Sequence, residues 1–227
     1  MKNTQWNEEG LNEVIDYVKR NMELDDVHGF KHVMRVVALC KIIYKNEIQR
    51  RIHKNHKDNM LISPIDINVL IFAAWLHDVG RTFESQRKEH HAIISAEMSE
   101  KFLKELAQNY EFIDNTFIKK VKLCILSHSF SLQKEFNRNK VSEEGKILSD
   151  ADKLDALGAV GIYRASAFQD RTGTGISGFL SHYKEKLSKL DEKLYTDSAK
   201  IIAKERKDLL DKFARQLTTE IRIESLE

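Results

Sequence analysis

Proline, cysteine and strand-like patterning are all scarce in this sequence. The chain has one proline, Pro64, and no sustained alternation of apolar and polar residues. Because proline is the main chemical stop for a helix, its scarcity favours long helices, and the missing alternation argues against β-strands. The only two cysteines, Cys40 and Cys124, each lie in an apolar helical pattern. Such positions indicate buried free thiols rather than a disulfide or a nucleophile.

The sequence also lacks a long apolar run and an excess of charge of one sign. Its longest apolar stretch, INVLIFAAWL, is too short to span a bilayer, and the polar start MKNTQWNEEG has no apolar signal region. The 37 basic residues nearly balance the 35 acidic ones, so no overall field attracts nucleic acid or acidic membrane. We therefore expect a soluble, cytoplasmic protein that binds neither membrane nor a nucleic-acid polymer. An anionic ligand must be held by local groups.

What is present is helical periodicity in a chain of 227 residues, a length typical of one domain. Apolar stripes begin at Leu11 and Val33, and Ser63-Pro64-Ile65-Asp66 resembles a helix start with a serine cap. Further helices are predicted at 90–107, 113–127, 143–169, 179–192 and 197–222, which makes the fold all-α. Gly158 and Gly161 fall inside one of these helices, where we expect close packing. The segment DRTGTGISG is interpreted as a flexible connector, with a phosphate-contacting loop as the alternative.

Three separated segments carry the residues with chemistry. His32 begins an apolar helix, and His77-Asp78 ends the apolar run AAWLHDVG, where both side chains would be costly to bury unless paired or bound to metal. The third segment, SDADKLDALGAVG, places three aspartates within six positions. Core packing does not explain these carboxylates, although some of them can pair with Lys153, Arg164 or a neighbouring helix. The three aspartates are Asp150, Asp152 and Asp155.

Two histidines and two carboxylates drawn from these segments would form a mixed nitrogen and oxygen ligand set. Such a set is typical of manganese, iron, cobalt or nickel sites, and it differs from the thiolate ligand set of a structural zinc site. Magnesium would prefer more oxygen ligands. Four protein ligands on a six-coordinate metal leave positions for water and substrate, which is typical of a catalytic site.

The order H…HD…D across separate helices resembles the HD-domain metal-dependent phosphohydrolase superfamily. The motifs HxxxHVxRV, AAxLHDVG, HHAxxSAE, SHSF and DADKLDALGAVGIYR are most similar to its bacterial nucleotide pyrophosphohydrolase-like branch. The resemblance covers about Asp25 to Phe213. It implies a single-domain helical bundle with an N-terminal helix at 1–24, a metal-binding core at 25–170, and a C-terminal loop and helices at 171–227 that pack on the core.

By this resemblance, His32, His77, Asp78 and Asp152 fall on the metal-ligand positions of the family. Asp152 is preferred to Asp150 because the last ligand of the family lies in an A-D-[KR]-L context. The resemblance implies one divalent metal ion. Manganese is our first choice, with iron, cobalt, nickel or magnesium as alternatives, and a second metal remains open.

Some relatives use further histidines for a second metal, for phosphate contact or for proton transfer. His91 and His128 are candidates for these roles, and capping is the alternative for both. With Asp78 as the group that orients water, they form our predicted catalytic set. We expect His90 to be exposed. Four further residues are predicted to contact substrate: His28, Arg35, Arg81 and Lys153. The alternative for His28 is a hydrogen bond at the start of a helix, and the alternative for the other three is a surface ion pair.

Two differences from related branches of the superfamily narrow the predicted reaction. The stretch Val79-Gly80-Arg81-Thr82 lacks the acidic pair of related stringent-response hydrolases, and no GYP signature follows the HD pair. The resemblance therefore implies hydrolysis of a nucleoside triphosphate to a monophosphate and pyrophosphate. The alternatives are a phosphomonoesterase, a cyclic phosphodiesterase, a di-iron oxygenase, or a nucleotide- or nucleic-acid-binding helical protein without turnover. A homodimer is also left open.

Overall fold

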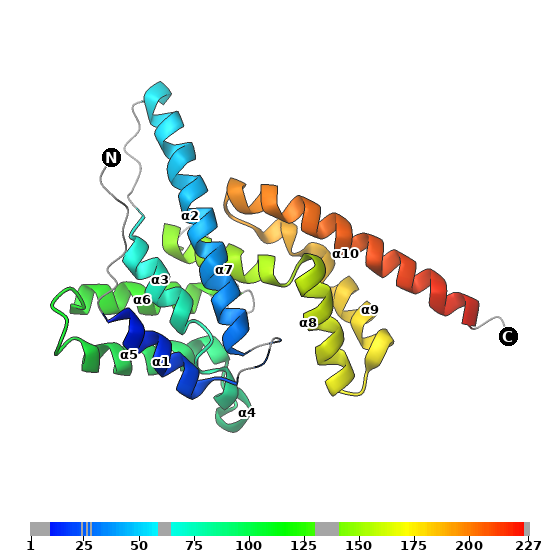
Figure 1. The fold of residues 1–227 in the computed structure, drawn as a ribbon, viewed down its shortest axis with the longest axis horizontal. Helices are drawn as coiled ribbons and strands as arrows, with labels where there is room; N and C mark the ends of the chain where they lie inside the picture. The colour runs from blue at the N-terminus through cyan, green and yellow to red at the C-terminus, as the bar shows by residue number, and fades with distance from the viewer. Residues whose placement is uncertain are drawn as a thin grey trace. The chain divides into compact units, whose positions relative to one another are not determined.

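The computed structural model describes residues 10–23, 25, 27, 29–58, 65–129 and 141–224. The chain forms two compact units, Met1–Ser149 and Asp150–Glu227. All regular secondary structure in the described residues is helical (Figure 1), which confirms the all-α prediction. None of the described helices combines the length and apolar character needed to cross a bilayer. The prediction of a single domain is not tested and stays a prediction.

The first unit packs its helices around α3. Contacts join α3 to α1, α2, α5 and α6, and α5 also lies along α6. The helices of this unit are α1 (Leu11–Asn21), α2 (Phe30–Asp58), α3 (Ile67–Leu76), η1 (Arg81–Phe83), α4 (Glu84–Arg87), α5 (His91–Leu106), α6 (Asn115–His128) and the first part of α7 (Glu143–Asp155).

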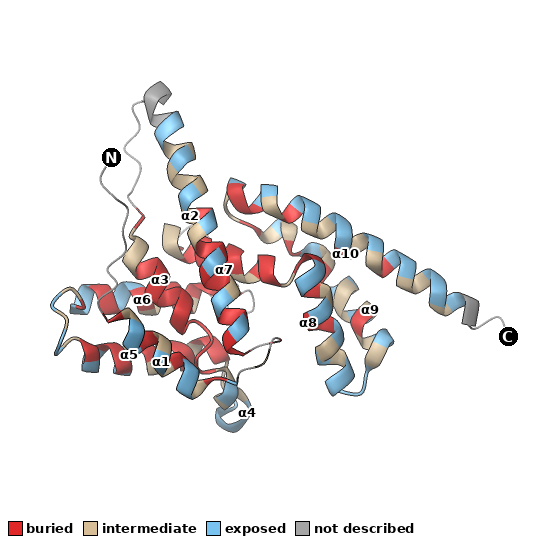
Figure 2. Ribbon diagram, viewed as in Figure 1, coloured by how far each residue is buried: buried red, intermediate tan, exposed pale blue. Residues whose placement is uncertain are grey.

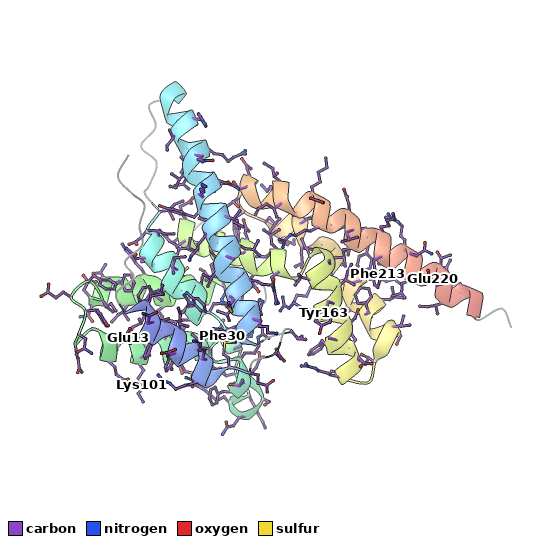
Figure 3. The ribbon with its side chains drawn as sticks, viewed as in Figure 1. Glu13, Phe30, Lys101, Tyr163, Phe213 and Glu220 are labelled. Atoms are coloured by element: carbon purple, nitrogen blue, oxygen red, sulfur yellow. The ribbon has the colours of Figure 1, made fainter. Side chains whose placement is uncertain are left out.

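Helix α3 is apolar on every face, so it can only be stable as a core helix. Every residue from 69 to 76 is buried, and Figure 2 shows α3 almost wholly in the colour of buried residues. Phe72 packs edge-on against Phe117, and Trp75 lies against Phe30. Figure 3 labels Phe30 at the start of α2. The end of α3 is therefore held firmly, and this end carries His77 and Asp78.

The start of α3 differs from the prediction. Asp66 is the N-cap, and its carboxylate accepts hydrogen bonds from the backbone N–H groups of Asn68 and Val69. The expected serine cap, Ser63, and Pro64 lie outside the described residues. An aspartate cap also places negative charge at the positive end of the helix dipole.

The second unit consists of the remainder of α7, α8 (Gly158–Arg171), α9 (Gly175–Glu185), η4 (Leu187–Lys189), η5 (Asp191–Lys193) and α10 (Asp197–Glu224). Helix α8 packs against both α9 and α10. Phe179 of α9 meets Phe213 of α10 edge-on, with ring centroids 5.4 Å apart. Exposed residues outnumber buried ones in α10, and the buried residues lie along one side (Figure 2). The helix predicted at 179–192 begins earlier, at Gly175, and ends at Glu185.

The single helix predicted at 143–169 is wrong, because the chain breaks between α7 and α8. Gly158 has φ +71°, a conformation that residues with a Cβ rarely adopt. A Cβ at this position would also lie 3.0 Å from Cγ of Arg206, whose Nη1 donates a hydrogen bond of 2.7 Å to the Leu154 carbonyl. The positive φ of Gly158 therefore changes the chain direction where α8 begins, three residues after α7 ends at Asp155.

Candidate metal centre

The ring orientation of His77 follows from where α3 ends. His77 is the C-cap, and its Nδ1 lies 2.8 Å from the Ala74 carbonyl oxygen one turn back. A carbonyl only accepts, so Nδ1 carries the proton and Nε2 presents a lone pair. This backbone contact fixes the tautomer in the way that ligand histidines are commonly fixed.

Asp78 lies at the centre of a buried group of histidines in the first unit. Its Oδ2 is 3.7 Å from Nε2 of His32 and 3.9 Å from Nε2 of His77. Its Oδ1 is 3.4 Å from Nε2 of His91 and 4.0 Å from Nε2 of His128. All five side chains are buried. The two carboxylate oxygens thus face two different pairs of imidazoles.

Three further helices deliver the remaining histidines. His32 lies in the first turn of α2, His91 is the first residue of α5, and His128 is the last residue of α6. His128 resembles His77, because its Nδ1 donates to the carbonyl of Ile125 and turns Nε2 towards Asp78. Ser149 donates a hydrogen bond of 2.8 Å to the carbonyl of His128 and so fixes the end of α6.

The donor set fits a divalent metal ion. The ligand atoms of His32, His77 and Asp78 lie within 4.8 Å of one another, and so do those of Asp78, His91 and His128. Within the part of the chain that the structure describes, the buried Oδ1 of Asp78 accepts no hydrogen bond. A buried carboxylate oxygen without a donor is costly unless a cation is present. Imidazole nitrogens with a carboxylate suit manganese, iron, cobalt or nickel.

Electrostatics favour an ionised Asp78. Burial alone would raise its pKa, but the positive charge of the Arg81 guanidinium holds the pKa well below its usual range. Arg81 makes the closest contact, with Nε donating to Oδ2 at 2.8 Å. The predicted residue Arg81 therefore lies at the site and contacts the carboxylate directly.

His91 is oriented by Glu84, a residue that the sequence did not indicate. Glu84 Oε1 lies 3.3 Å from both Nδ1 and the backbone N–H of His91. Burial lowers the pKa of His91 to about 4, although the Asp78 carboxylate opposes this effect. The imidazole is thus neutral at neutral pH, with Nδ1–H donating to the Glu84 carboxylate and Nε2 facing Asp78. Glu84 is a short-range partner on α4, and only the fold shows that its carboxylate faces His91.

Two other contributors were also missed. Ser95 of α5 accepts a hydrogen bond of 2.9 Å from the backbone N–H of Gly80, which fixes the turn after Asp78. His90 was expected to be exposed, but it is half-buried and hydrogen-bonded to Ala92 and Ser129. The prediction for His90 was wrong because the side chain folds back over the start of α5.

The three aspartates of the third segment have different environments in the second unit. Both oxygens of Asp150 accept hydrogen bonds, from the backbone N–H groups of Tyr195 and Thr196 and from the Thr196 hydroxyl. Asp155 pairs with Arg164 at 2.8 Å. Asp152 is half-buried on α7. Its role as fourth ligand stays a prediction.

The remaining predicted residues are less well defined. Lys153 is buried in the second unit, with its ammonium 5.6 Å from the centroid of the Tyr195 ring. Arg35 lies half-buried on α2, one turn after His32. His28 lies outside the described residues. The substrate roles of all three stay predictions.

Comparison with known proteins agrees with this geometry. Residues 29–157 match the HD domain family. YpgQ of Bacillus subtilis, an uncharacterized protein, is 39% identical over 97 residues, which cover 41% of this chain and 47% of YpgQ. The matched segment therefore spans about half the length of this curated relative.

Solved structures extend the likeness along the chain. A protein from Lactobacillus plantarum has a TM-score of 0.71 and 25% identity, over 96% of this chain and 100% of its own. YpgQ in complex with ADP has a TM-score of 0.64 and 26% identity, over 92% and 97% of the two chains. An HD-superfamily hydrolase from Bacillus thuringiensis has a TM-score of 0.63 and 25% identity, over 94% and 97%. The chain therefore belongs to the HD domain family, within the superfamily of metal-dependent phosphohydrolases.

Proposed function

We propose that this protein hydrolyses a nucleoside triphosphate or related nucleotide to a monophosphate and pyrophosphate, using a divalent metal held by His32, His77, Asp78 and Asp152. The observation that carries the proposal is the buried Asp78 carboxylate, with imidazole nitrogens facing both of its oxygens. The nucleotide class is supported by the ADP complex of YpgQ. Manganese remains our first choice of metal.

A bound divalent cation would supply Lewis acidity, lowering the pKa of its water from about 15.7 to about 7 and neutralising charge on a phosphoryl group. The chain supplies the rest. Asp78 orients the attacking water. His91 and His128 are placed to move a proton at Nε2, because each ring has its Nδ1 engaged elsewhere. Arg81, Arg35 and Lys153 are the proposed phosphate contacts.

The assignment of Asp152 gains support from its neighbours. The Asp150 carboxylate accepts three hydrogen bonds, and the Asp155 carboxylate forms an ion pair with Arg164. All of these partners belong to the second unit. Replacing Asp150 should therefore destabilise that unit, whereas Asp152→Asn should remove bound metal. Equal metal content in Asp152→Asn and the wild type would reject Asp152 as a ligand.

The decisive experiment is a hydrolysis screen of metal-stripped protein with nucleotides, each tested with manganese, magnesium, cobalt, nickel or ferrous iron. Pyrophosphate as product supports the proposal. Orthophosphate or a linear nucleotide would instead indicate a phosphomonoesterase or a cyclic phosphodiesterase. His77→Ala and Asp78→Ala should each lose most bound metal and activity while retaining helicity. His53→Ala is the matched control, since His53 is exposed on the same helix as His32.

A second metal is favoured by one observation, the two separate groups that share Asp78. One is formed with His32 and His77 through Oδ2, and the other with His91 and His128 through Oδ1. Elemental analysis of the loaded protein counts the ions directly. One ion per chain supports the mononuclear proposal, while two irons with oxygen consumption would support an oxygenase.

A further inference from the structure

The start of α5 and the end of α6 meet beside the candidate metal centre. His90 is the N-cap of α5, and its Nδ1 accepts a hydrogen bond of 3.2 Å from the backbone N–H of Ala92. A histidine is an unusual cap, since serine, threonine, aspartate and asparagine are the preferred residues at this position. Something other than capping is therefore needed to explain a histidine here.

The second ring nitrogen of His90 supplies that explanation. Its Nε2 lies 3.2 Å from Oγ of Ser129, the buried residue that ends α6. Because Nδ1 accepts from Ala92, the neutral ring carries its proton on Nε2. His90 must then donate to Ser129. One imidazole thus links the first turn of α5 to Ser129, the C-cap residue of α6.

Because both ring nitrogens of His90 form hydrogen bonds, His90 is not a metal ligand in this arrangement. Glu84, His90 and His91 lie close enough together to hold a metal ion. In the tautomer that these contacts require, however, the Nδ1 lone pair of His90 accepts from the Ala92 N–H and its Nε2 carries a proton. His90 therefore acts through hydrogen bonds in this arrangement and not as a ligand.

The link lies between the two histidines that share Oδ1 of Asp78. His91 directly follows His90, their ring centroids are 4.2 Å apart, and His128 directly precedes Ser129. We propose that His90 is a positioning residue, which sets the spacing of His91 and His128 across Asp78 through its hydrogen bond to Ser129. The inference rests on the proposed function, because it assumes that His91 and His128 act in hydrolysis.

A double-mutant cycle tests the link. His90→Asn keeps an acceptor suited to an N-cap but lacks the donor to Ser129, and Ser129→Ala removes the acceptor. Each single variant should lower kcat about fivefold, the effect of one lost hydrogen bond, with KM and manganese affinity little changed. The double variant should be no slower than the slower single variant, because both remove the same interaction. Ser129→Thr keeps the hydroxyl and should retain wild-type kcat.

A measurement without substrate separates this inference from the proposed reaction. In ¹⁵N spectra of the imidazoles, His90 should show a protonated Nε2, and the His91 and His128 signals should shift in both single variants. If the wild type hydrolyses no nucleotide, the proposed function fails, while these spectra still decide the role of His90.

Three results would overturn the role of His90. In the first, His90→Ala is impaired while His90→Asn and Ser129→Ala match the wild type, which would mean that His90 only caps α5. In the second, the effects of the two single variants multiply in the double variant, which would mean that they act independently. In the third, His90 carries its proton on Nδ1.

Discussion

Gly80 provides the sharpest test of how the turn after Asp78 is held. A Cβ at this position would lie 2.6 Å from the backbone nitrogen of Ser95 and 2.8 Å from Cβ of Ile94. These atoms belong to α5 and cannot rotate away. Its φ of −90° is open to any residue, so the conflict in Gly80→Ala is one of space and not of backbone conformation.

The expected cost follows from two effects. Forcing a methyl group into a packed interior costs about 1–3 kcal/mol. Moving the turn away from α5 also weakens the hydrogen bond from the Gly80 N–H to Ser95 Oγ, and a buried N–H without a partner costs about 1–3 kcal/mol. Because the two effects share one displacement, we expect a loss of about 2–4 kcal/mol. Ser95→Ala removes only the acceptor and should lose about 1–2 kcal/mol.

Urea unfolding followed by tryptophan fluorescence measures this loss. Trp75 is buried on α3 in the first unit, so its emission reports on the unit that contains the turn. Gly80→Ala should also bind manganese more weakly, since the displaced turn carries Asp78. A variant within about 0.5 kcal/mol of wild type, the range of ordinary surface substitutions, would refute the claim that α5 and the turn are in fixed contact.

Three further predictions concern the metal and the second unit. Manganese at a hundredfold excess over its Kd should stabilise the first unit by about 2.7 kcal/mol in the same urea assay, and His77→Ala should abolish this effect. Arg164→Ala should destabilise the second unit by about 3–5 kcal/mol, measured by circular dichroism, because it leaves the buried Asp155 carboxylate without its cation; a loss below 1 kcal/mol would contradict this account. Burial and the hydrogen bond to Asp211 raise the pKa of Tyr183 to about 12. The free energy of unfolding that this hydrogen bond contributes is therefore fully present below about pH 10 and is lost as the pH rises through about 12. A spectrophotometric titration that Tyr183→Phe leaves unaltered would contradict that shift.

The sequence predicted the fold class well because helical periodicity is a local signal. The helices around His32 and His77, and those at 90–107 and 113–127, were recognised from apolar spacing. The break at Gly158 was missed because apolar periodicity continues through it, and a positive φ leaves no mark on that pattern. Local patterns therefore gave the helices but not the point where α7 ends.

The candidate site was predicted in outline and not in its supporting contacts. The resemblance to the HD superfamily singled out His32, His77 and Asp78, which the structure brings together. Glu84 gave no signal, and Ser129 lay within the quoted motif SHSF without a role assigned to it, since both roles depend on which helix ends meet in three dimensions. The metal ligands, the substrate contacts, a homodimer and a cytoplasmic location all stay predictions.

The complete burial of α3 has a consequence for how the site opens. Amide protons exchange slowly where helices are enclosed, and functional segments are commonly drawn from the least protected parts of a protein. Here the helix that carries the HD pair belongs to the most enclosed part of its unit. We therefore expect amides from Phe72 to Leu76 to exchange with deuterium only when the whole first unit unfolds. Substrate turnover would then take place beside a rigid helix, with local opening confined to other segments.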